Sequence, residues 1–156
     1  MLDLPAISLA ASEVRRAQPA DLPAVREVLA SHWPQFADEL HRSLDQLVAS
    51  PTDAIFLNFA YGQPCGCVMM AAGEVAVIHA LCIAPDFRRA SRMCDLVQAG
   101  VQWARAERVG CAVLACVLAQ DRPQIDRFAR LGFVRKTELD RPSIRVLMLH
   151  GPLSRS

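Results

Sequence analysis

The stretch from residue 75 to residue 118 constrains the fold more than any other part of the chain. It holds an apolar run at 75–83, a proline at position 85, apolar residues at helical spacing over 90–108, and a second apolar run at 111–119. Each apolar run fits a buried strand and is too short to cross a bilayer as a helix. Two strands joined by one helix form a βαβ unit, with parallel strands and a right-handed crossover. The sequence therefore predicts an open sheet, in which the strand-to-helix turn is the usual place for a ligand.

The other segments add elements on both sides of this unit. We predict strands at 14–18, 54–61, 65–72, 133–137 and 144–150, and further helices from Pro19, from Pro34 to Pro51 and at 123–131. A hairpin turn is expected at 62–64, where Gly-Gln-Pro separates two strand-like runs. The strand at 111–118 is expected to be buried on both faces, because it is apolar throughout. Gly110 and Gly132 are expected to end the helices that precede them.

The composition indicates one compact domain. Of the 156 residues, 53% are hydrophobic and 21% are charged, which argues against disorder and predicts a well-filled core. We assign the domain to residues 13–150, with a flexible N-terminal tail at 1–12 and a C-terminal tail at 151–156. The net charge of +1 gives no overall field that would draw the protein to a nucleic acid or an acidic membrane.

Cysteine spacing and the first residues both favour a cytoplasmic protein. The chain has six cysteines without a CxxC motif, and most of them lie inside apolar runs. Buried reduced thiols are therefore favoured over a disulfide framework or a metal site, and no metal is expected. The N-terminal segment is acidic rather than basic and lacks a long apolar core, so it does not match a signal peptide.

The turn at 85–93 concentrates positive charge where a long helix begins. The sequence APDFRRASRMCDL places Arg88, Arg89 and Arg92 between a buried strand and the first turn of this helix. The N–H groups and the positive dipole end of a helix start favour a phosphate, and arginines add bidentate donors. A solvated basic patch with ordinary capping explains the same residues, and taken alone they leave both interpretations open.

Two segments resemble the GNAT superfamily of acyl-coenzyme A-dependent N-acyltransferases, and the resemblance covers nearly all of residues 14–149. LCIAPDFRRASRMCDLVQAGVQWARAERVGC is similar to the family's pyrophosphate-binding motif, and DRPQIDRFARLGF resembles its later helix ending in Leu-Gly-Phe. The resemblance implies an α/β (α+β) fold with a mixed central sheet of about seven strands flanked by about four helices. It also implies that an acyl group, expected to be acetyl, moves from acyl-coenzyme A to an amine by direct attack in a ternary complex.

The same resemblance assigns residues that would bind acyl-coenzyme A. A bulge in the family splays the strand before the turn from the next strand, so that its backbone would contact the pantetheine arm. Asp121 stands where the family often has asparagine and would contact the same arm, although a helix N-cap explains it as well. The full set is Leu81, Cys82, Ile83, Arg88, Arg89, Ala90, Ser91, Arg92, Met93, Asp121 and Phe128.

Two positions in the turn depart from the family's pattern. Ser91 and Met93 stand where glycines usually let backbone N–H groups close on the pyrophosphate. Each would cost affinity if the backbone there needed a left-handed conformation. We expect weakened or remodelled cofactor binding, with the charges of Arg89 and Arg92 and the hydroxyl of Ser91 as compensation.

A third departure concerns the proton for the leaving thiolate. Many members carry a tyrosine for this purpose at the position of Phe128, and phenylalanine cannot donate a proton. Coenzyme A is a good leaving group and water can serve, so the departure need not abolish turnover. Tyr61 and Cys116 are candidate substitutes, and a strand-end aromatic and a buried thiol are the alternative explanations.

His79 is the best candidate for the base that takes a proton from the acceptor ammonium. It lies nine residues before Arg88, in VIHALCIAP, where several similar family members carry glutamate or histidine. Imidazole suits the task because it can accept and release a proton near neutral pH. A core histidine bonded to a backbone carbonyl is the alternative, and Glu74 is a weaker candidate for the base.

The acceptor is expected to be a small-molecule or peptide amine held by the first two helices. The candidate residues there are Trp33, Phe36 and Glu39, although an amphipathic helix pair explains the aromatic residues without a substrate. Two other functions stay open: a catalytically silent domain that senses acyl-coenzyme A or binds a protein partner, and an interaction domain that has lost the cofactor. A homodimer is also compatible with the sequence.

Overall fold

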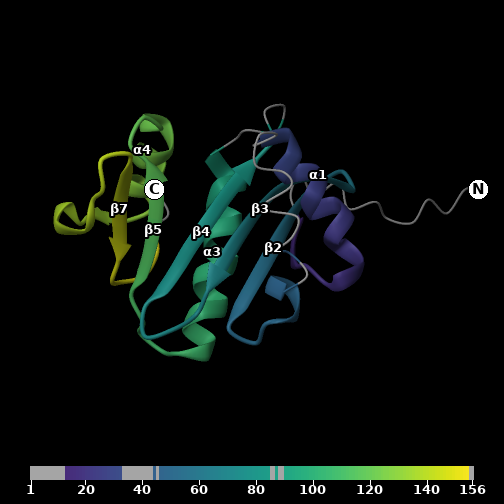
Figure 1. Cartoon of the computed structure of the whole chain (residues 1–156), viewed down its shortest axis with the longest axis horizontal. Helices are drawn as coiled ribbons and strands as arrows, with labels where there is room; N and C mark the ends of the chain where they lie inside the picture. Colours follow the sequence, from purple (N-terminus) through teal and green to yellow (C-terminus); the bar gives the residue numbers. More distant parts are fainter. Residues whose placement is uncertain (1–12, 33–43, 45, 85–86, 88–89, 155–156) are drawn as a thin grey trace, which may run out of the picture.

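A mixed sheet of seven strands forms the centre of the molecule (Figure 1). The computed structural model describes residues 13–32, 44, 46–84, 87 and 90–154. In this part of the chain the strands are β1 (Glu13–Arg16), β2 (Asp53–Ala60), β3 (Gln63–Ala71), β4 (Ala76–Ile83), β5 (Val113–Leu118), β6 (Val134–Arg135) and β7 (Ile144–Leu149). They lie in the order β1-β2-β3-β4-β5-β7-β6, and the β4–β5 pair is parallel whereas its neighbours are antiparallel. The predicted mixed sheet with a central βαβ unit is confirmed.

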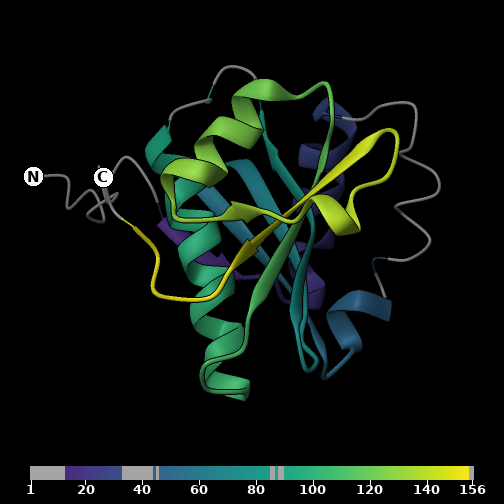
Figure 2. The same ribbon diagram turned by 90° about the vertical axis from the view of Figure 1, so that its left-hand side faces the viewer.

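Helices cover both faces of this sheet. They are α1 (Leu22–His32), α3 (Ala90–Glu107) and α4 (Arg122–Arg130), and residues 44 and 46–49 are helical as well. Short 3-10 turns precede α1 at Pro19–Asp21 and follow β6 at Thr137–Leu139. Figure 2 shows α3 and α4 on one face of the sheet and α1 on the other. The rest of the helix predicted from Pro34 lies outside the described residues, and none of the described helices is long and apolar enough to span a membrane.

Each helix packs through apolar residues at helical spacing. On one face of the sheet, α3 buries Met93, Leu96, Val97, Val101 and Ala104 in a core that also contains Ile78 and Phe128. On the other face, α1 buries the four residues that the sequence predicted, namely Leu22, Val25, Val28 and Leu29. Gly132 directly follows Leu131, the C-cap of α4, with φ of 102°, which confirms it as the residue that ends this helix. The prediction for Gly110 was wrong, because α3 already ends at Glu107 and Gly110, with φ of 75°, lies in the turn that leads to β5.

The hairpin between β2 and β3 turns one or two residues earlier than the sequence indicated. Ala60 pairs with Gln63, so the loop consists of Tyr61 and Gly62, with φ of 51° and 78°. Two-residue hairpin loops with positive φ at both positions match the right-handed twist of the strands. The prediction of a turn at 62–64 was therefore wrong, because Pro64 belongs to β3, where it pairs with Phe59 beside a bulge.

The strand β5 is buried on one face only. Val113, Ala115 and Val117 are buried in the core under α3, whereas Cys116 is exposed and Leu118 is 45% exposed. The prediction that 111–118 is buried on both faces was wrong, because α1 packs over β3 and β4 rather than over β5. An apolar run alone cannot tell which of its residues a helix will cover.

Candidate functional site

The parallel strands β4 and β5 pair over only part of their length. Their ladder joins Ala76 to Val113, Val77 to Leu114 and Ile78 to Ala115, and both strands continue beyond it. Past this ladder the two ribbons diverge, as Figure 1 shows. The splayed arrangement that the resemblance implied is thus present at the centre of the sheet.

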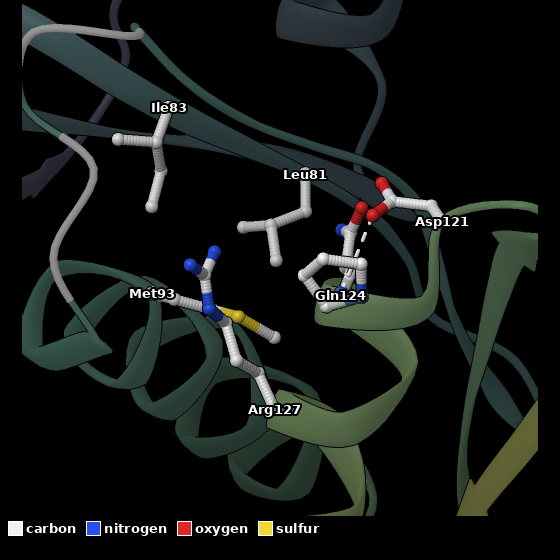
Figure 3. A pocket seen from close by; sticks show the side chains of 7 residues that line it. Leu81, Ile83, Met93, Asp121, Gln124 and Arg127 are labelled. Carbon is white, nitrogen blue, oxygen red and sulfur yellow. Dashed lines mark hydrogen bonds between the residues drawn. The ribbon is translucent and has the colours of Figure 1, made fainter.

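A pocket of about 200 Å³ lies beside the diverging part of β4 (Figure 3). Its walls come from β4, the first turn of α3, and the start of α4, and its lining is Leu81, Ile83, Met93, Asp121, Pro123, Gln124 and Arg127. Ligand pockets usually measure roughly 300–1,000 Å³. This pocket would therefore enclose one section of a long ligand and leave the rest on the surface.

The polar groups of the pocket are divided between its two ends. Asp121 and Gln124 lie together at one end, where the Asp121 carboxylate accepts a hydrogen bond of 3.3 Å from the Gln124 backbone N–H. This bond makes Asp121 the N-cap of α4, so the capping explanation is confirmed. Arg127 supplies the other end: its guanidinium extends over Met93 toward Ile83 (Figure 3). One end of the pocket therefore carries a carboxylate and the other a cation.

Arg92 points into the protein instead of toward the pocket. It is 4% exposed, and its Nη1 donates to the Asn58 Oδ1 at 3.5 Å and lies 3.7 Å from the Cys65 Sγ. Its guanidinium also stacks over the Phe87 ring, 5.6 Å from the centroid. Arg92 thus joins the start of α3 to the β2–β3 hairpin, and in this conformation it does not line the pocket.

Cys65 is the thiol in this buried group. Burial raises its pKa, and the nearby Arg92 charge lowers it by a smaller amount, so the net pKa is raised. The protonated thiol donates to the Asn58 Oδ1 at 3.1 Å. Cys65 therefore serves as a hydrogen-bond donor at neutral pH rather than as a reactive thiolate.

The backbone at Ser91 and Met93 is helical. Both residues belong to the first turn of α3, and among the described non-glycine residues only Tyr61 has a positive φ. The freedom of glycine is therefore not needed for the conformation that the chain adopts here. Met93 is buried and forms the apolar floor of the pocket beside Arg127. Arg88 and Arg89 lie outside the described residues, as do Trp33, Phe36 and Glu39.

His79 is exposed at a bulge in β4. Met70 pairs with Ile78 and Met69 pairs with Ala80, so His79 is the extra residue of the bulge. Ile78 belongs to the core under α3 and Ala80 packs against the core under α1, so the alternation of side chains along β4 is broken at His79. Because His79 is exposed, the alternative explanation as a core histidine does not hold.

The other candidates for proton transfer occupy three different places. Glu74 is exposed in the turn that precedes β4, and Tyr61 is 60% exposed in the β2–β3 turn. Cys116 follows Ala115, the last β5 residue in the ladder with β4, so it lies where the strands begin to diverge. Cys116 is exposed, but neighbouring protein partly desolvates its thiol and raises its pKa. Cys116 therefore lies one residue beyond the ladder on β5, as His79 does on β4.

Two further residues of the predicted cofactor set are in the core. Phe128 is 1% exposed and packs edge-to-face against Phe133, with ring centroids 4.9 Å apart. Cys82 is buried on the α1 side of β4. Neither side chain lines the pocket, whereas Leu81, Ile83, Met93 and Asp121 from the same set do.

Sequence reasoning missed three pocket residues, Pro123, Gln124 and Arg127. A signal for two of them was present, because Asp121, Gln124 and Arg127 follow one another at intervals of three residues along α4. Within the described part of the chain, no group of three or more metal-ligating side chains is close enough to hold a metal ion.

Comparisons with known proteins agree with this geometry. A family model described as the acetyltransferase (GNAT) family matches residues 22–133, which is more than half of the chain. The chain belongs to the GNAT acetyltransferase family. A search of curated proteins found no match.

Solved structures share the GNAT fold at low sequence identity. The PaiA N-acetyltransferase from Thermoplasma acidophilum, solved with coenzyme A, is 14% identical with a TM-score of 0.75, covering 90% of this chain and 99% of that one. The ribosomal-protein-S18-alanine N-acetyltransferase from Escherichia coli is 15% identical with a TM-score of 0.72, covering 93% and 96%. An acetyltransferase from Thermus thermophilus is 20% identical with a TM-score of 0.71, covering 90% and 97%. At these identities the likeness establishes the fold.

Proposed function

We propose that this GNAT protein is an N-acetyltransferase that moves an acyl group from acyl-coenzyme A to an amine by direct attack in a ternary complex. One observation carries the proposal. The pocket lies on the α3 and α4 side of β4, His79 is exposed at the β4 bulge, and both lie next to the end of the β4–β5 ladder at Ile78 and Ala115. A thioester held in the pocket and an amine that contacts His79 would come together at this gap.

Different residues along the pocket and the β4 bulge would bind the acyl-coenzyme A and deprotonate the amine. Acyl-coenzyme A would supply the activated thioester, with its pantetheine arm along Leu81 and Ile83 and past the Asp121–Gln124 end. Holding the two reactants in one geometry lowers the entropic barrier to attack. His79 would accept the ammonium proton of the acceptor directly or through water, because only a neutral amine is nucleophilic.

The proton for the leaving thiolate needs a source other than Phe128, which is buried and has no acidic hydrogen. Cys116 is at the divergence of the strands, and its raised pKa keeps the thiol protonated at neutral pH. The thiol has a proton that can pass to the leaving thiolate, which the phenylalanine side chain lacks. We therefore assign this role to Cys116 ahead of Tyr61, which is in the β2–β3 turn.

The acceptor is proposed to be a small-molecule or peptide amine in the cytoplasm. The test is release of coenzyme A from acetyl-coenzyme A with a panel of polyamines, aminoglycosides, amino acids and N-terminal peptides. We expect at least one amine to raise thiol release above the rate of hydrolysis without an amine, in proportion to protein concentration. Mass spectrometry of the amine should show the added acetyl group.

A silent sensor of acyl-coenzyme A is the second candidate, favoured by the burial of Phe128 where the family has a proton donor. Thermal unfolding with acetyl-coenzyme A separates the two. A ligand at a hundred times its dissociation constant stabilises the folded state by about 2.7 kcal/mol. Stabilisation without turnover of any amine would favour the sensor, and an unchanged unfolding temperature would contradict both.

A further inference from the structure

The distribution of arginines around the start of α3 differs from what the turn sequence suggests. Arg92, one of three arginines in the predicted phosphate cradle, is buried against Asn58 and Cys65. The cation that does line the pocket comes from another helix: Arg127 lies in the second turn of α4. Arg127 follows Arg92 by thirty-five positions, so the sequence of the turn does not reveal that an arginine from α4 takes the place of Arg92 in the pocket.

We infer that Arg127 binds the diphosphate of acyl-coenzyme A from the α4 side, opposite the N-terminal turn of α3. The inference rests on the proposed function and deepens it. Arg127 is half-buried, and its guanidinium lies over Met93, a residue in the first turn of α3, and points toward Ile83 at the end of β4. A diphosphate bound here would contact the backbone N–H groups at the start of α3 on one side and the Arg127 guanidinium on the other.

The charges of the pocket also fix the direction of the ligand. Asp121 carries a carboxylate at the far end and would repel a phosphate there. That carboxylate can instead accept a hydrogen bond from an amide N–H of the uncharged pantetheine arm. The anionic part therefore belongs at Arg127 and the arm at Asp121, which directs the thioester toward the end of the β4–β5 ladder.

Arginine is better suited to this position than a flexible lysine. The planar guanidinium presents parallel donors to two phosphate oxygens, and the partial burial of Arg127 restricts its side chain before the ligand binds. The apolar floor that Met93 forms excludes water from one side of the contact, which strengthens the attraction between the opposite charges. The position thus combines a cation, an apolar support and a helix start.

The test is calorimetric titration of wild-type protein and Arg127→Met with coenzyme A and with 3′-dephospho-coenzyme A. Loss of a charge-assisted contact of this kind should weaken binding about 10- to 100-fold. If Arg127 contacts the diphosphate, the loss is the same for both ligands, because both carry it. Arg127→Lys should lose less affinity than Arg127→Met, since lysine keeps the positive charge but lacks the paired N–H donors of the guanidinium.

Arg122→Met is the matched control, because Arg122 is an exposed arginine on the same helix that does not line the pocket. Its affinity should stay within about twofold of wild type, and the unfolding temperature of each variant reports whether it is folded. Equal affinity of Arg127→Met and wild type would overturn the inference and leave the proposed function standing. A loss seen with coenzyme A alone would assign Arg127 to the 3′-phosphate and also overturn it. Failure of wild-type protein to bind either ligand would instead contradict the proposed function.

Discussion

Replacing His79 by alanine is expected to lower kcat for amine acetylation by about 10²- to 10⁴-fold, the usual contribution of a positioned base. His79 is the exposed extra residue of the β4 bulge, and it is not among the residues that line the pocket. Because it lies outside the pocket that would hold acyl-coenzyme A, the dissociation constant for that ligand should change little. Steady-state kinetics with the best amine of the panel and calorimetry with coenzyme A measure the two effects.

A second histidine provides the control for this experiment. His150 is exposed directly after β7, and His150→Ala should keep the wild-type kcat. His79→Glu should recover part of the activity, since a carboxylate can also accept the ammonium proton. If His79→Ala retained the wild-type kcat, the base would be another group or the amine would lose its proton to solvent, and the assigned role would be wrong.

Replacing Phe128 by alanine should have the largest effect on stability. Phe128 is 1% exposed and packs edge-on against Phe133, so truncation removes a buried ring and leaves a cavity. Substitutions of this type cost about 3–5 kcal/mol of unfolding free energy. For a chain of 156 residues this corresponds to a fall of roughly 6–20 °C in unfolding temperature, measured by calorimetry or circular dichroism.

Val134→Ala is the comparison for Phe128→Ala, because Val134 is 60% exposed just beyond the helix that carries Phe128. It should change the free energy of unfolding by less than about 0.5 kcal/mol. Phe128→Ala should also weaken coenzyme A binding, since Phe128 supports α4, which supplies Gln124 and Arg127 to the pocket. If Phe128→Ala lowered the free energy of unfolding by less than about 1 kcal/mol, Phe128 would not be a main packing residue of this core.

The order and type of the elements could be predicted because local signals agree with the final packing. Pro19 and Gly132 mark helix ends, and the apolar residues of α1 and α3 recur at helical spacing. The βαβ unit followed from two apolar runs separated by apolar residues at helical spacing, because two strands joined by one helix pair in parallel through a crossover. These signals act within a few residues and do not depend on distant contacts.

Apart from the hairpin turn at 62–64, the wrong or missing predictions concern contacts between distant segments. The apolar run of β5 gave no sign that α1 would leave Cys116 and Leu118 uncovered. The basic turn gave no sign that Arg92 would point toward Asn58, which precedes it by thirty-four residues. Pocket residues on α4 were missed for the same reason, because their role depends on where α4 packs against the end of β4. Burial and direction of a side chain are properties of the assembled sheet.

The structure of this protein with bound acetyl-coenzyme A tests the central claim most directly. We predict the diphosphate at the first turn of α3, the pantetheine arm along Leu81 and Ile83, and the thioester carbon at the end of the β4–β5 ladder, within reach of a water or amine that contacts His79. A nucleotide bound on another surface, or a thioester that lies away from the gap between β4 and β5, would contradict the account.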